Sequence, residues 1–276
     1  MDALAWGCIG IAGLAVLWQG VGWFLRRVGL VRANYRGVGI PVGFGLVTVL
    51  WSSAALLMAP RAVGLPGRVA WPYLAAVAGF GGLGFVDDLW GDRSATGLRG
   101  HLRALVLERR VTTGLVKALG GLLLAAALGA WIGEGGPAAA GLRCLTIALS
   151  ANAVNLLDLR PGRAGAAFLA LAAVMAAGLL AGGRGTYVWP LALVALPAFA
   201  VYLADRRARV MMGDTGSNAL GAALGLSLAI SAPLGCLAAA TALLLALHLY
   251  AERGSLSRAI EARPILRALD RLTGER

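Results

Sequence analysis

Acidic residues lie at the ends of hydrophobic segments in this chain, a placement that is costly unless the charges serve a function. Asp87 and Asp88 end one apolar segment, Asp158 ends a second, and Asp214 precedes a third. In proteins, Mg²⁺ typically takes one or two carboxylates and completes its shell with water and phosphate oxygens. The sequence therefore predicts a metal and phosphate site at a membrane surface. For Asp87 and Asp88 alone, a solvated acid pair that balances nearby arginines is an equal alternative.

A polar stripe leads to the second acidic position. Asn152, Asn155 and Asp158 follow one another at three-residue spacing, which keeps them within one broad face of a helix. The two asparagines could instead join helices through hydrogen bonds, and that alternative stays open. Asp158 favours a site, because ionisable groups inside a membrane mark functional positions.

The third acidic position is flanked by glycines in Met212–Ser217, just before an apolar segment. Amide groups at the start of a helix can face an anion, and Asp214 would hold the metal that bridges this anion. The alternative is helix capping, since Asp, Thr and Ser all cap helix N-termini well.

Lys117 is the only lysine among 25 basic residues, and it lies at the start of an apolar segment. A compact ammonium in a chain that otherwise uses arginine indicates a need for a point charge rather than a planar fork. The alternative is a lysine whose stem snorkels along the helix to water.

The elements that must position these groups are membrane-spanning helices. The chain of 276 residues is 59% hydrophobic and 14% charged, and its mean hydropathy is +0.78. We expect an all-α, polytopic bundle of about nine spans over residues 1–252, followed by a basic, amphipathic cytoplasmic tail over residues 253–276. The expected spans are 3–24, 40–59, 69–86, 117–133, 142–157, 164–182, 187–204, 217–232 and 233–251.

Basic residues predict the orientation, because Lys and Arg accumulate in loops that stay in the cytoplasm. An outside N-terminus and a cytoplasmic C-terminus leave only four of the 25 basic residues outside or near that side: Arg61, Arg68, Arg143 and Arg184. The same orientation puts every acidic motif on the cytoplasmic side. We therefore expect a multi-pass membrane protein with its active face in the cytoplasm.

Two basic amphipathic stretches should lie on the membrane surface rather than cross it. One covers residues 97–113, and the other is the tail from Ser255, which Pro264 should break or kink. The net charge of +12 is spread over short loops, with no soluble domain to carry a nucleic-acid footprint. Anionic membrane lipids are therefore the expected partners, and nucleic acid is not.

Taken in order and with their spans, these motifs resemble those of the polyprenyl-phosphate N-acetylhexosamine-1-phosphate transferases, the superfamily of phospho-N-acetylmuramoyl-pentapeptide transferase. Gly39–Gly45 resembles the early glycine-proline motif of this family, and Thr113–Lys117 resembles its lysine motif. Each motif is weak alone, but the ordered set is specific and extends through most of the chain.

The resemblance implies a Mg²⁺-dependent reaction in which a polyprenyl phosphate attacks the sugar-proximal phosphate of a UDP-activated amino sugar and releases UMP. It implies that Asp87 and Asp88 handle the acceptor phosphate and its proton, that Asp214 binds Mg²⁺, and that Lys117 offsets phosphate charge. The implied donor contacts are Asn152, Asn155, Asp158, Gly213 and Ser217. The implied setting is cell-envelope glycan synthesis, such as that of peptidoglycan, at a bacterial-type plasma membrane, and a homodimer is left open.

The chain also departs from the pattern of that family. Leu159–Gly162 replaces its Gly-Leu-Asp-Gly, and Arg206–Met211 replaces its Asn-x-Pro-Ala-Lys-Val-Phe pattern, while its histidine motif and tenth span are missing. Groups for metal and prenyl phosphate thus persist, whereas those for nucleotide and sugar have changed. We expect a divergent transferase of a HexNAc- or MurNAc-type sugar 1-phosphate. The alternative is an inactive scaffold that binds prenyl phosphate or a lipid-linked sugar. A transporter is less favoured, because the carboxylates gather at one face rather than at the bilayer midplane.

Overall fold

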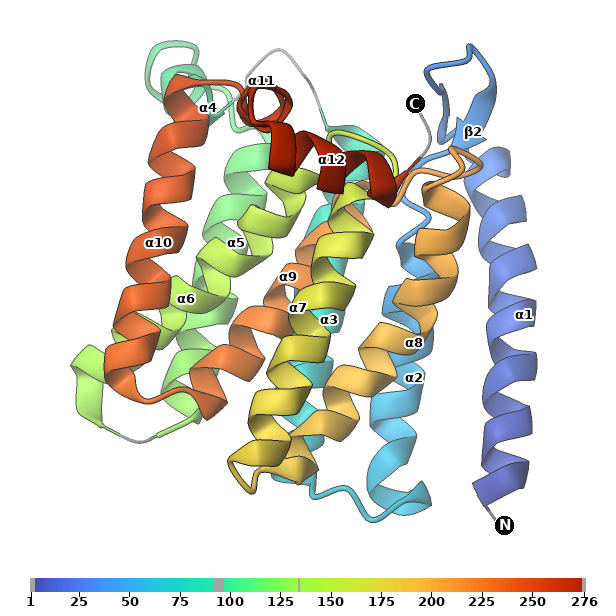
Figure 1. Ribbon diagram of the computed structural model, residues 1–276. Helices are drawn as coiled ribbons and strands as arrows, with labels where there is room; N and C mark the ends of the chain where they lie inside the picture. Colours follow the sequence, from blue (N-terminus) through green and yellow to red (C-terminus); the bar gives the residue numbers. More distant parts are fainter. Residues whose placement is uncertain (1–2, 92–96, 134, 275–276) are drawn as a thin grey trace.

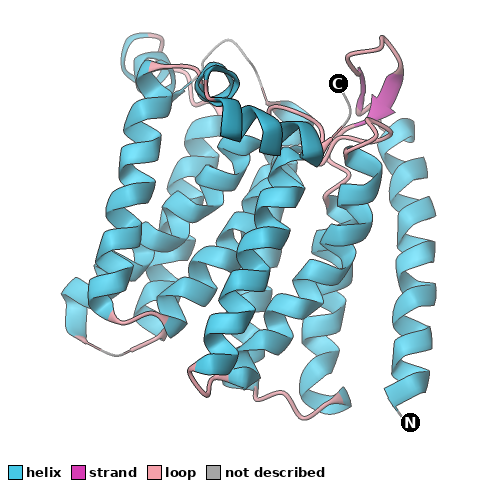
Figure 2. Cartoon of the chain, viewed as in Figure 1, coloured by secondary structure: helices cyan, strands magenta, loops and turns pink. Residues whose placement is uncertain are grey.

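The computed structural model describes residues 3–91, 97–133 and 135–274, and most of these are helical (Figure 2). Long helices run side by side through the height of the molecule, and short elements cover one end (Figure 1). The N-terminus lies at one end of the bundle and the C-terminus at the opposite end. The expectation of an all-α bundle is confirmed.

The long helices are, in chain order, α1 (Ala3–Arg27), α2 (Leu46–Ala62), α3 (Gly67–Trp90), α5 (Thr113–Trp131), α6 (Gly136–Leu157), α7 (Arg163–Ala181), α8 (Val188–Asp205), α9 (Gly213–Ser231) and α10 (Leu234–Arg253). A 3₁₀ turn, η1 (Gly185–Tyr187), leads into α8. The short elements are β1 (Val31–Ala33), β2 (Gly39–Pro41), α4 (Gly97–Leu107), α11 (Leu256–Ala262) and α12 (Pro264–Thr273). Strands β1 and β2 pair antiparallel, and they lie at the same end of the bundle as α4, α11 and α12 (Figure 1). We call this end the basic end.

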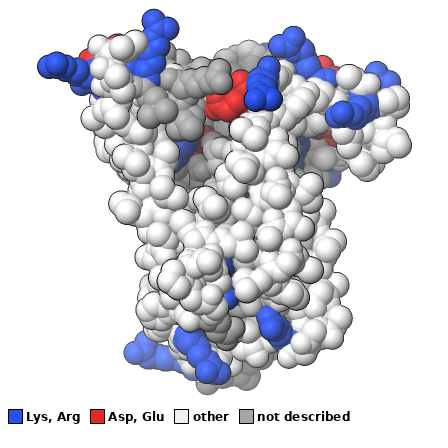
Figure 3. Space-filling view, turned by 90° about the vertical axis from the view of Figure 1, so that its left-hand side faces the viewer, with Lys and Arg blue, Asp and Glu red and all other residues white. Residues whose placement is uncertain are grey.

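Seven of the described helices are long and apolar enough to cross a bilayer, and they are α1, α3, α5, α6, α7, α8 with η1, and α10. Helix α2 is apolar but shorter, and α9 begins with a polar turn. Charged side chains lie mainly at the two ends, and a broad band between them is almost free of charge (Figure 3). The chain is therefore a multi-pass membrane protein, whereas nine spans and the orientation stay predictions.

Several helix boundaries differ from those predicted: α6 and α9 begin earlier than expected, at Gly136 and Gly213, and three further differences bear on the site. The span expected at 40–59 begins only at Leu46, because Gly39–Pro41 pairs as β2 and the chain then turns before the helix. Helix α3 continues to Trp90, so the adjacent acids lie in its last turns rather than beyond its end. Helix α5 begins at Thr113 instead of 117, because the Thr112 side chain caps it by accepting the amide of Leu115 at 3.2 Å.

Helix α9 lies at the centre of the bundle and packs mainly against α3 and α6. Glycines allow this approach. A Cβ on Gly84 of α3 would lie 2.2 Å from the Asp214 carbonyl oxygen, and one on Gly221 of α9 would lie 2.3 Å from that of Ser150. Such small residues let helix backbones touch in lipid, where hydrophobic driving force between helices is lacking. The contact brings the basic-end termini of α3, α6 and α9 to one place.

Both stretches expected on the membrane surface contain helices. The first forms α4, which ends at Leu107, earlier than the expected 113. The tail forms two helices, and the break falls at Pro264, which is the first residue of α12. Pro264 therefore breaks the tail as predicted, because a helix tolerates proline in its first turn but not in its interior.

Candidate functional site

A single ammonium group joins two of the acidic motifs at the basic end. Lys117 of α5 donates to an Asp87 carboxylate oxygen of α3 at 2.8 Å and also to the Asp214 carboxylate of α9. The three side chains are 20%, 19% and 28% exposed, so each keeps some contact with its surroundings. Three helices thus place two negative charges around one positive charge, and we call these residues the Lys117 cluster.

Asp88 has a different environment from its neighbour. It is 8% exposed, and its carboxylate accepts the amides of Asp214 and Thr215 at 3.0 and 2.9 Å and the Thr215 hydroxyl at 2.6 Å. These bonds satisfy amide groups that the first turn of α9 would otherwise leave without partners. Asp88 therefore positions the turn that carries Asp214, while Asp87 faces the lysine.

Two glycines with left-handed backbone make room for the Asp88 carboxylate. Gly43 has φ +75° and Gly213 has φ +74°. A Cβ would lie 3.2 Å from an Asp88 oxygen in the first case and 2.6 Å in the second. The backbone of residues 44–45 also hydrogen-bonds the carbonyls of Met211 and Met212, both at 2.9 Å. The glycine-proline segment thus supports the start of α9.

The polar stripe of α6 reaches the cluster through Asn155. Its amide donates to Asp214 at 3.3 Å, and its carbonyl oxygen accepts the Ser217 hydroxyl at 2.9 Å. Asn218, which sequence reasoning missed, donates to the Asp214 carbonyl at 2.6 Å. Asn152 is partly buried one helical turn farther from the basic end. The stripe therefore orients the Asp214 carboxylate, and this explains why an asparagine and a serine stand at these positions.

Asp158 follows the last residue of α6 and receives a hydrogen bond from the Gly213 backbone. Burial raises the pKa of Asp158 well above its ordinary value, and the nearby carboxylates of Asp205 and Asp214 raise that pKa further. Asp88 at the end of α3, Asp158 after α6 and Asp205 at the end of α8 thus all approach the segment where α9 begins.

Sequence reasoning missed Asp205, the last residue of α8. It is 3% exposed, and its carboxylate accepts the amide of Gly162 at 2.7 Å and that of Met212 at 3.3 Å. It therefore holds the loop after α6 against the loop before α9. The sequence feature that could have indicated Asp205 is its place as a lone acid at the end of an apolar segment, just before Arg206, Arg207 and Arg209.

The tail helices cover the loop that follows Asp158. Arg163 donates to both carboxylate oxygens of Asp270, at 2.7 and 3.0 Å, and both residues are buried. Arg160 forms a second ion pair with Glu261. A Cβ on Gly162 would lie 2.2 Å from the Thr273 carbonyl oxygen, so the backbones touch. We call residues 160–163 together with 257–274 the tail interface.

The Lys117 cluster suits a divalent cation in its donor set. Among the described residues, no group of three or more His, Cys, Asp or Glu side chains could hold a metal by itself. Asp87 and Asp214 nevertheless converge on one point, because both carboxylates bond the same nitrogen atom. Two carboxylates fit a cation that draws its other ligands from water and phosphate.

Of the predicted site residues, the structure brings Asp87, Lys117, Asp214, Asn155 and Ser217 into one connected network. Asp88, Gly213 and Asp158 lie beside this network, and Asn152 lies deeper in the bundle. These positions show proximity, while the roles of the residues stay predictions.

Comparison with known proteins gives one family. The model described as glycosyl transferase family 4 matches residues 70–232, more than half of the chain. The matched part begins within α3 and ends after α9, so it contains the whole Lys117 cluster. Among curated proteins, none matches the chain significantly.

Proposed function

This chain belongs to glycosyl transferase family 4, the family of polyprenyl-phosphate N-acetylhexosamine-1-phosphate transferases, and from that premise we propose that it transfers a sugar 1-phosphate from a UDP-sugar to a polyprenyl phosphate. The sugar is of the HexNAc or MurNAc type. The product is a lipid-linked sugar for cell-envelope glycan synthesis, made at the cytoplasmic face of a bacterial-type plasma membrane.

The observation that carries this proposal is the Lys117 cluster. Phosphoryl transfer between two anions depends on positioning and on neutralising charge, rather than on covalent chemistry by the protein. Lys117 supplies a point charge, and its two aspartate partners hold that charge in place at the basic end of three helices. When a phosphate enters the cluster, Lys117 would donate a hydrogen bond to it in place of one of its bonds to a carboxylate.

The residues of the site divide the reaction between them. An oxygen of the acceptor phosphate attacks the sugar-proximal phosphorus, and the bond from that phosphorus to the UMP oxygen breaks. Asp87, the less buried acid of the adjacent pair, takes a proton from the acceptor phosphate where one is present. Lys117 stabilises the negative charge that builds on the phosphoryl oxygens. Asp88 touches no substrate in this scheme and instead positions Asp214.

Asp214 and Asp87, whose carboxylates converge on one point, would hold Mg²⁺, and when bound it would neutralise phosphate charge. Asn155 and Ser217 keep the Asp214 carboxylate turned towards that point. The donor then lies over the ends of α6 and α9, against Asn155, Asp158 and Gly213. Arg206–Met211 and Leu159–Gly162 lie beside this surface and determine which donor fits.

The test measures UMP release by purified protein with undecaprenyl phosphate, Mg²⁺ and a panel of UDP-HexNAc and UDP-MurNAc donors. Asp214→Asn should lower the rate by a factor on the order of 10²–10³, the effect typical of losing one group that stabilises a transition state. The matched control is Glu108→Gln, which removes an exposed acid paired with Arg110 and should leave the rate unchanged. Equal loss in both variants would contradict the assignment.

A second candidate is a scaffold that binds prenyl phosphate without transferring sugar. It is favoured by the tail interface, which covers Gly162 and Arg163 on the proposed donor side. Binding of a lipid phosphate needs the Lys117 charge but no donor surface. If prenyl phosphate binds in a Lys117-dependent manner and no donor in the panel is turned over, the scaffold replaces the transferase.

A further inference from the structure

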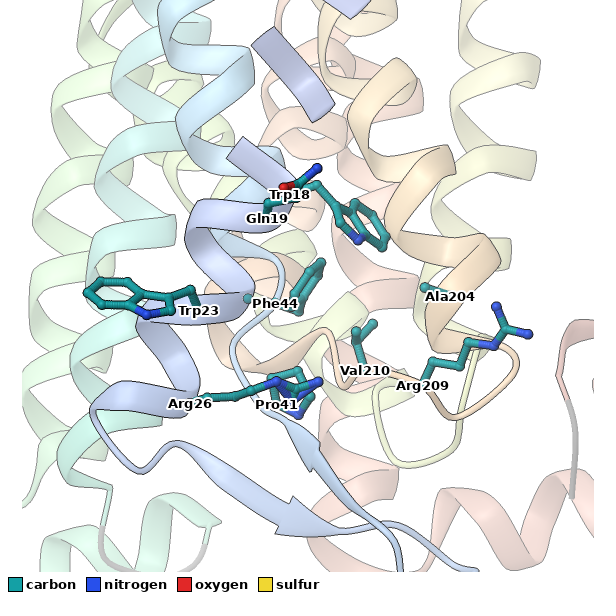
Figure 4. A pocket seen from close by; sticks show the side chains of 10 residues that line it. Trp18, Gln19, Trp23, Arg26, Pro41, Phe44, Ala204, Arg209 and Val210 are labelled. Atoms are coloured by element: carbon teal, nitrogen blue, oxygen red, sulfur yellow. The ribbon is translucent and has the colours of Figure 1, made fainter. Parts of the chain in front are cut away.

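A cavity lies outside the Lys117 cluster, between α1 and the loops of the basic end (Figure 4). It has a volume of about 480 Å³. Its apolar walls include Trp18 and Gly22 of α1, Phe44 before α2 and Val210 before α9. Trp18 and Phe44 meet edge to face with ring centroids 4.7 Å apart, so the aromatic wall is well packed.

Two arginines line the same cavity from different elements. Arg26 comes from the last turn of α1, and Arg209 comes from the loop between α8 and α9 (Figure 4). Gln19 adds a neutral polar group, and no acid belongs to the lining. Within the part of the chain that the structure describes, neither guanidinium has a carboxylate partner. The cavity is thus complementary to an anion rather than to a neutral ligand.

The surroundings of the cavity match the headgroup level of a bilayer. Helix α1 stands at the edge of the bundle, and only 11% of its apolar window is buried (Figure 1). Trp23, also in the lining, is 68% exposed one turn before the basic end of this helix. Tryptophan at a span's end typically lies at the membrane interface, and arginine beside it faces anionic headgroups. The cavity therefore opens where lipid phosphates lie.

We propose that this cavity binds an anionic phospholipid of the adjacent leaflet, whose charged headgroup is attracted by Arg26 and Arg209 from two sides of the cavity. The first carbons of its acyl chains lie against Trp18, which packs on Phe44 in the same wall. The cavity lining includes neither Lys117 nor either of its aspartates. The bound lipid is therefore a resident lipid rather than the acceptor, and its binding is independent of the proposed transfer.

The experiment is native mass spectrometry of the purified chain with phosphatidylglycerol or phosphatidylcholine, supported by thermal unfolding with each lipid. We expect one retained phosphatidylglycerol and a higher unfolding temperature with that lipid alone. Arg26→Gln with Arg209→Gln should weaken its binding roughly tenfold to thirtyfold, since each arginine near an anionic surface contributes about one factor of five. Gly22→Leu keeps both charges but fills the cavity beside Phe44 and should also displace the lipid.

The matched control pair is Arg103→Gln with Arg258→Gln, two exposed arginines of α4 and α11 that do not line the cavity. An equal loss of lipid in this pair would overturn the proposal in favour of general surface charge. Equal binding of phosphatidylcholine would overturn the role of the arginines. Displacement by equimolar undecaprenyl phosphate would make the cavity an acceptor site instead. Lys117→Met should leave phosphatidylglycerol binding unchanged, which separates this site from the cluster.

Discussion

The Lys117 cluster and the tail interface both bring opposite charges together at the basic end, but they use them differently. In the cluster, one ammonium is shared by two carboxylates from two other helices, and all three side chains are 19% to 28% exposed. In the tail interface, the Arg163 and Asp270 side chains are 5% and 4% exposed and satisfy each other with two parallel hydrogen bonds. A saturated, buried pair has no capacity left for a ligand, whereas a shared and open one does. Geometry thus separates charges that hold the fold from charges that can exchange partners.

The largest expected effect comes from breaking the buried pair. Arg163→Met removes the arginine that forms two hydrogen bonds with the buried Asp270 carboxylate and should destabilise the protein by about 3–5 kcal/mol. Adding Asp270→Leu removes that charge as well and should restore most of the stability. Thermal unfolding in detergent measures both. If the double variant is stable but no longer releases UMP, the tail interface takes part in the reaction. Its charges would then not serve the fold alone, in contrast to the role assigned to them.

The Lys117 cluster should show the opposite profile, with a large effect on rate and a small one on stability. Lys117→Met should slow UMP release by about 10²–10³, because the phosphoryl oxygens lose a preorganised charge. Lys117→Arg should recover little, since a planar guanidinium cannot take the place of a compact ammonium between two carboxylates. Rate and unfolding temperature are measured on the same preparations. Full activity of the arginine variant would show that only the net charge matters.

The adjacent acids Asp87 and Asp88 allow the contrast to be tested within one helix turn. Asp88→Asn replaces an acceptor of three hydrogen bonds and should cost about 1–3 kcal/mol of stability, because donors at the start of α9 lose their partner. Asp87→Asn is the matched control, since Lys117 keeps Asp214 as a partner and stability should change less. Unfolding temperatures rank the two variants, and a larger loss in Asp87→Asn would reverse their assigned roles.

Much of this arrangement could be predicted from the sequence, because membrane helices have few ways to satisfy charged residues. Hydropathy predicted the bundle, and the ordered motifs predicted that Asp87, Lys117 and Asp214 belong together. The metal-binding role proposed for Asp214 therefore follows from the sequence without the structure. The family match covers residues 70–232, and these include all three residues.

Other features depended on contacts between segments far apart in the chain, which no local pattern records. Asp87 and Asp88 are adjacent residues of the same type, and no local pattern distinguishes them. Only the position of α9 makes Asp88 an acceptor of backbone amides, while Asp87 pairs with Lys117. Asp205 was missed because its two amide partners lie 43 and 7 residues away. The tail has the amphipathic pattern of a surface helix, and the same pattern also suits docking over α7 through Asp270.

The smallest expected effect belongs to the half-exposed pair of Arg160 and Glu261 in the tail interface. Its side chains are 34% and 41% exposed, so Arg160→Gln should change stability by less than about 1 kcal/mol. Arg160 lies two residues after Asp158, beside the proposed donor surface. If Arg160 binds the donor's phosphates, Arg160→Gln should raise KM and leave kcat and the unfolding temperature unchanged. Glu261→Gln removes the same ion pair but keeps the arginine, so it should leave KM unaltered or lower it. A matching rise in KM in both variants would mean that the ion pair, rather than the arginine itself, shapes the donor surface. The tail interface would then take part in donor binding, and the contrast between it and the Lys117 cluster would be weaker.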